Sequence, residues 1–87
     1  MNVTTIVTQL TLIATGSSMM ASSIAQRALQ VTRQYEAGEL SLSEYQELIG
    51  DIQTEQLIFI EAAAITLKQQ LAALFSTITS AAQIVTA

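Results

Sequence analysis

The stretch that decides the fold of this chain is Ala37-Gly38-Glu39-Leu40-Ser41-Leu42-Ser43-Glu44-Tyr45, because it carries the signals that end one helix and begin another. Gly38 suits the left-handed conformation in which helices close. Ser41 and Glu44 have the spacing of a capping box, with Ser41 as N-cap and Glu44 as the third helical residue. Leu40 and Tyr45 are placed around the cap as a hydrophobic staple. We therefore expect a helix-turn at these five residues.

Before this turn the apolar residues recur with a helical period. The repeating positions are Val3, Ile6, Leu10, Ile13, Met20, Ile24 and Val31. The first dozen residues are also rich in Thr, Val and Ile, which favours strands. They alternate poorly between apolar and polar, however, so we expect a helix over about residues 3–37.

After the turn a second apolar row follows a slightly longer period. Its members are Tyr45, Ile49, Ile52, Gln56, Ile60, Ala63, Leu67, Leu71, Leu74, Ile78, Ala82 and Val85. The row recurs about every 11 residues, or about 3.67 per turn, which is typical of straight or slightly right-handed packing. The row predicts a helix over about residues 42–86. Its polar member Gln56 either fixes the register of packing or lies at the periphery.

The fold class expected from these patterns is all-α. It consists of two long antiparallel helices joined by a short turn near residues 37–41, a single helical hairpin over residues 1–87. At 1.5 Å per residue, the two helices would be roughly 50 and 70 Å long. In an isolated hairpin each helix buries only the face that packs on the other helix and leaves further apolar residues in water. We therefore expect the hairpin to be packed into a larger helical assembly.

The composition excludes several classes of site. The chain has no Cys and no His, and its formal net charge is −4. Disulfides, thiolate metal sites and histidine bases are therefore excluded. The three basic residues Arg27, Arg33 and Lys68 do not cluster, which argues against nucleic acid as a partner. The start of the chain lacks the basic region of a signal peptide.

Charged residues occur only between Arg27 and Lys68. In a hairpin, both arms beyond them would be uncharged and would have to meet other protein chains or a bilayer. A second apolar line on the helix after the turn has no use in an isolated hairpin. The candidate partner interface consists of Leu48, Ile58, Phe59, Ala62, Ile65 and Ala72.

Residues that could perform catalysis are not grouped in any known pattern. Glu44, Glu47, Asp51 and Glu55 form an acidic stripe, but a metal site would need facing ligands, and the first helix offers only Glu36. A solvated acidic face explains the stripe better. No His, Cys or nucleophile-elbow motif is present to activate a Ser or Thr. We expect neither an enzyme nor a cofactor.

Glu61 is the one charge within an apolar run, about twenty residues after the turn. A two-helix chain of this length with such a carboxylate resembles the proton-carrying subunits of rotary ATP synthases. That resemblance implies a membrane ring in which Glu61 carries the proton. The first helix lacks the repeated glycines of that family, and the turn lacks its basic-polar signature. The simpler interpretation is that Glu61 faces water or pairs with another chain.

Two other classes of protein resemble this chain, one in length and the other in amino-acid composition. The hairpin subunits of secretion needles are similar in length, although this chain lacks their proline. Small helical components of phage tails, baseplates and capsids are similarly rich in Ala, Ser, Thr and Gln. We therefore expect a non-enzymatic structural component of a virion or secretion-type particle, with copies of itself or other proteins as partners. The alternatives are a two-helix membrane protein, holin-like or ring-forming, and a small assembly chaperone or adaptor.

Overall fold

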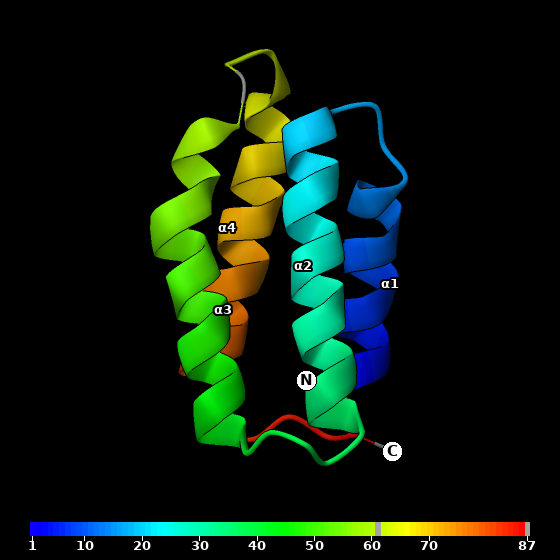
Figure 1. Cartoon of the computed structure of the whole chain (residues 1–87), viewed down its shortest axis with the longest axis vertical. Helices are drawn as coiled ribbons and strands as arrows, with labels where there is room; N and C mark the ends of the chain where they lie inside the picture. The colour runs from blue at the N-terminus through cyan, green and yellow to red at the C-terminus, as the bar shows by residue number, and fades with distance from the viewer. Residues whose placement is uncertain (61, 87) are drawn as a thin grey trace.

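The computed structural model describes residues 1–60 and 62–86 and shows a bundle of four α-helices (Figure 1). The helices are α1 (Val3–Ala14), α2 (Met19–Glu36), α3 (Leu42–Gln56) and α4 (Ile65–Ser80). Two short 3₁₀ helices, η1 (Leu57–Phe59) and η2 (Ala62–Ala64), lie between α3 and α4. The all-α fold class is confirmed, and the described residues contain no β-strand. The bundle measures 35 × 22 × 18 Å.

The two long helices expected from the sequence are not formed, because each of them folds back on itself. The first break lies between α1 and α2. The Ser18 side chain accepts a hydrogen bond from the Ala21 amide at 3.3 Å and caps α2. The Ser22 hydroxyl donates to the Ala14 carbonyl at the end of α1. A Cβ at Gly16 would lie 3.2 Å from the Ile13 carbonyl oxygen, so glycine relieves crowding at this bend.

The second break lies between α3 and α4 and has no such local signal. Ile60 leaves the helix with an extended backbone, φ −69° and ψ 133°. Leu57 and Ile60 are both buried, at 5% and 6% exposure. The helix therefore ends here because the chain turns to bury these two side chains on the bundle core. Glu61, the residue compared above with a proton carrier, lies outside the described residues.

Folding each arm in half explains why four helices form. A two-helix hairpin would leave one face of each apolar row in water, whereas four helices enclose both rows in one core. Most members of both rows are buried there: Val3, Ile6, Leu10, Ile13, Ile24, Tyr45, Ile49, Ile52, Ile60, Leu71, Leu74 and Ile78. Ala63 is exposed and Leu67 is partly buried, because the second row is interrupted at the break.

The helix-turn closes the opposite end of the bundle from the two breaks (Figure 1). Gly38 has φ +81°, in the left-handed region that glycine favours. The Ser41 hydroxyl accepts from the Glu44 amide at 3.1 Å, and the Glu44 carboxylate accepts from the Ser41 amide at 2.9 Å. These reciprocal bonds form a capping box at the start of α3.

The segment after α4 crosses this same end of the bundle (Figure 1). The Val3 amide donates to the Val85 carbonyl at 2.8 Å, and the Tyr35 hydroxyl donates to the Ile84 carbonyl, also at 2.8 Å. Ile84 is only 4% exposed. The side-chain amide of Gln46 donates to the Ile78 and Ala81 carbonyls at the end of α4. A continuous helix to residue 86 was expected, but these contacts end it at Ser80.

Candidate protein-interaction surface

Large hydrophobic side chains are exposed on several segments at the end of the bundle where both arms fold back. The five most exposed among the described residues are Leu12, Met19, Ile58, Phe59 and Ile65, at 69%, 82%, 68%, 61% and 49%. They lie in the last turn of α1, at the start of α2, in η1 and at the start of α4. All of these segments lie toward the same end of the bundle, the upper end in Figure 1. We call these five residues the apolar end.

Charged residues are sparse in the described segments around the apolar end. No Asp, Glu, Lys or Arg occurs in residues 1–26, and none occurs in 56–60 or 62–67. The carboxylates of α3 follow the length of that helix, where Glu44, Glu47, Asp51 and Glu55 are exposed, and Glu55 lies in its last turn, next to η1. Exposed large apolar side chains with few charged neighbours are unfavourable in water and typical of a surface that another protein covers.

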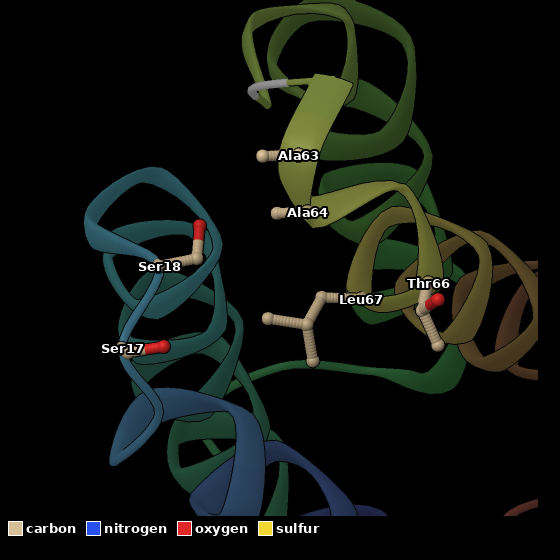
Figure 2. Close-up of a pocket in the computed structure, with 6 residues that line it drawn as sticks. All are labelled: Ser17, Ser18, Ala63, Ala64, Thr66 and Leu67. Atoms are coloured by element: carbon tan, nitrogen blue, oxygen red, sulfur yellow. The ribbon is translucent and has the colours of Figure 1, made fainter.

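A shallow pocket opens beside the apolar end, between the α1–α2 connection and the start of α4 (Figure 2). Its volume is about 330 Å³. It is lined by Ser17, Ser18, Ala63, Ala64, Thr66 and Leu67. In Figure 2 the Leu67 side chain and the Ser17 hydroxyl point toward each other across it, and the methyl groups of Ala63 and Ala64 point the same way as Leu67. The lining residues are three small hydroxyl residues and three apolar residues and carry no charge, which suits an aliphatic side chain better than a charged ligand.

The residues of the candidate interface are divided by the fold. Ile58, Phe59, Ala62 and Ile65 are exposed and lie in η1, η2 and the start of α4, at the same end of the bundle. Leu48 is 38% exposed on the body of α3, and Ala72 is partly buried against the core. The sequence predicted one continuous apolar line along a straight helix. In the structure its residues are divided between the apolar end and the sides of the bundle.

Sequence reasoning missed Leu12 and Met19 as members of this surface. They flank the break between α1 and α2, and they reach the apolar end only because the chain turns there. The available signal was Thr15-Gly16-Ser17-Ser18, in which a glycine and a capping serine stand together. Leu12 also lies off the buried row, next to Ile13, which made it a candidate for an exposed apolar residue.

The helix-turn end differs from the apolar end because its aromatic and polar side chains are packed and hydrogen-bonded. The Tyr35 and Tyr45 rings stack with centroids 4.8 Å apart and an interplanar angle of 8°. The Thr32 hydroxyl, completely buried, donates to the Ala28 carbonyl at 2.7 Å, so the Tyr45 hydroxyl donates to Thr32, also at 2.7 Å. Burial raises the pKa of Tyr45. Hydrogen bonds from Ser41 lower the pKa of Glu44.

The described residues contain no group of three His, Cys, Asp or Glu side chains placed to hold a metal ion. No helix within them has both the length and the apolar character needed to cross a bilayer. What the surface offers chemically is uncharged apolar area beside a small pocket. Comparisons with protein-family models, with curated proteins and with solved structures find no match for this chain.

Proposed function

We propose that this chain is a non-enzymatic assembly component whose apolar end is buried against other protein chains. The observation that carries the proposal is the gathering of Leu12, Met19, Ile58, Phe59 and Ile65 at one end of the bundle. Each large apolar side chain taken out of water contributes up to about 1.5–3 kcal/mol. Burying five of them together would therefore supply a substantial driving force for association.

The biological setting of this assembly is proposed from composition. The chain is rich in Ala, Ser, Thr and Gln and has no Cys, a texture similar to that of small helical components of virions and secretion-type particles. Such a chain is a building block whose exposed apolar surface is covered once the particle forms. The runner-up is a membrane protein, which would be recovered from the membrane fraction and would need detergent to stay in solution.

The test is to express the chain without detergent and measure its mass in solution over a range of concentrations. The key variant is Ile58→Asp/Ile65→Asp, which adds two charges at the apolar end. The control variant is Gln30→Asp/Ser43→Asp, which adds two charges at exposed positions on α2 and α3, outside the apolar end. We expect the first variant to reduce assembly strongly and the control to leave it unchanged, with the helical circular-dichroism signal preserved in both.

The outcome that counts against the proposal is a wild-type chain that stays monomeric, soluble and stable at every concentration. Its apolar end would then be tolerated in water and would need no covering chain. Equal loss of assembly in both variants would also contradict it, because the effect would then follow net charge instead of the apolar end.

A further inference from the structure

We propose that residues 81–86 form a strap that opens while the four helices stay folded, and that the site it leaves binds the same segment of a second copy. The strap follows α4 and crosses the helix-turn end of the bundle (Figure 1). We call the groups that hold it, at Met1, Val3 and Tyr35, the strap site. Because this site lies at the opposite end of the bundle from the apolar end, the inference does not depend on the proposed function.

The strap is held by hydrogen bonds to its backbone. The Val85 carbonyl accepts from the Val3 amide at 2.8 Å, and the Val85 amide donates to the Met1 carbonyl at 3.2 Å. These two bonds belong to an isolated parallel β-bridge. The Tyr35 hydroxyl donates to the Ile84 carbonyl at 2.8 Å. Main-chain bonds of this kind hold an extended segment in place, while its side chains decide which segment fits.

A single side chain anchors the strap in the bundle. Ile84 is only 4% exposed, whereas Ala82, Gln83, Val85 and Thr86 are exposed. Detaching the strap therefore brings one large apolar side chain into water, far less apolar area than the loss of a helix would expose. Segments with few buried contacts open at a smaller free-energy cost than the whole fold. The strap should thus open without unfolding of the bundle.

The chain between α4 and this anchor is the pivot for opening. The Gln46 side chain donates to the Ile78 and Ala81 carbonyls at 2.9 and 2.8 Å and so holds the end of α4 against α3. These bonds lie outside the strap site and remain when the strap opens. The two residues that follow are exposed, so rotation of their backbone moves Ile84 out of its site and leaves α4 in place.

The open strap site selects its occupant by chemistry. Val3 is the first residue of α1, and its amide has no partner within that helix, so the occupant must offer it a carbonyl. The occupant must also be extended and carry an aliphatic side chain in the place of Ile84. Neither the strap nor residues 1–3 carry a charged side chain, so no like charges meet here. Residues 81–86 of a second copy meet every requirement, and exchange of an identical segment replaces each contact by an equal one.

Opening is tested by hydrogen exchange of the Val3 amide, which reports directly on the strap site. NMR measures how far exchange is slowed relative to an unstructured chain, in wild type and in full-length Ile84→Asp, which places a charge at the anchor. The Ile49 amide, within α3, reports on the folded bundle. We expect less protection at Val3 than at Ile49 in wild type. In the variant Val3 exchange should accelerate by roughly tenfold or more, while Ile49 stays protected. Ile84→Ala takes its place if the charge unfolds the bundle.

Binding by a second chain is tested on the same variant. A peptide of residues 81–86, blocked at both ends, should restore the protection of Val3 in full-length Ile84→Asp, and the same peptide carrying Ile84→Asp should not. Unlabelled wild-type chain added to isotope-labelled Ile84→Asp chain should restore it in proportion to its concentration. Unlabelled Ile84→Asp chain is the matched control and should have no effect.

Equal protection of Val3 and Ile49 in wild type would overturn the proposal, because the strap would then open only when the bundle unfolds. Unchanged protection of Val3 in both Ile84 variants would overturn it as well, since Ile84 would not be the anchor. If the peptide fails to restore protection, the strap site does not bind a second chain. Restoration by the peptide but not by wild-type chain would overturn the second copy as the occupant.

Discussion

The two ends of this bundle differ in how well their side chains are buried and hydrogen-bonded. At the helix-turn end, Gly38 supplies the left-handed turn, Ser41 and Glu44 cap α3, and Tyr45 is fully buried and stacked on Tyr35. At the apolar end, Ile58 and Phe59 are more than half exposed. The helix-turn end therefore contributes to the stability of the isolated chain, whereas the apolar end leaves large hydrophobic side chains in water.

The largest expected difference is in the free energy of unfolding, between an alanine substitution at Tyr45 and one at Phe59. Tyr45→Ala removes a ring that is completely buried and stacked on Tyr35, so the free energy of unfolding should fall by about 3–5 kcal/mol. Phe59→Ala removes a ring that is 61% exposed and should change it by less than about 1 kcal/mol. Urea unfolding of dilute samples measures both. Equal losses would mean that the apolar end is part of the monomer's own core.

A smaller effect is expected at the turn itself. Gly38→Val should lower the free energy of unfolding by about 1–2 kcal/mol, because its φ of +81° is unfavourable for a β-branched residue. A Cβ at this position would meet no atom within 4 Å, so strain in the backbone is the only cause. Gly38→Asn is the matched control and should lose less, since Asn tolerates left-handed conformations. Similar losses for Val and Asn would point to a cause other than φ.

The capping box should contribute somewhat less than Gly38 to the free energy of unfolding. Ser41→Ala removes the acceptor for the Glu44 amide, and thermal or urea unfolding should show a loss of about 1 kcal/mol. Ser43→Ala, at an exposed position in the same first turn, should be close to neutral. If the two variants unfold alike, the hydrogen bond from the Glu44 amide does not stabilise the start of α3.

The smallest expected effect is a pH dependence at the same box. The pKa of Glu44 is lowered in the folded chain by its bonds to Ser41, so the carboxylate contributes stability above its unfolded pKa. That contribution is lost as the pH falls through the lowered, folded-state pKa. Unfolding measured from neutral to acidic pH should therefore depend less on pH in Glu44→Gln than in wild type. An unchanged pH profile would show that this carboxylate is not linked to folding.

Phe59 and Met19 show why the apolar end could be predicted only in part. Phe59, Ile58 and Ile65 stood out because they lie outside the buried row, and that judgement needs only the helical period. Met19 joins them through the fold alone, because it depends on the chain turning at Gly16 and Ser18. The sequence therefore predicted that an apolar surface would be left over, but not the end of the bundle at which it gathers.

What the sequence by itself determined are features set by neighbouring residues: the helical periods, the left-handed glycine and the capping box at Ser41 and Glu44. Each depends on hydrogen bonds and side-chain spacing within about one or two turns. The tertiary structure decided where the long helices break. At Ile60 the local preference for helix is outweighed by burial of Leu57 and Ile60 on a core made by distant segments. Such a balance between helix continuation and burial exists only once the four helices have met, so no local pattern records it.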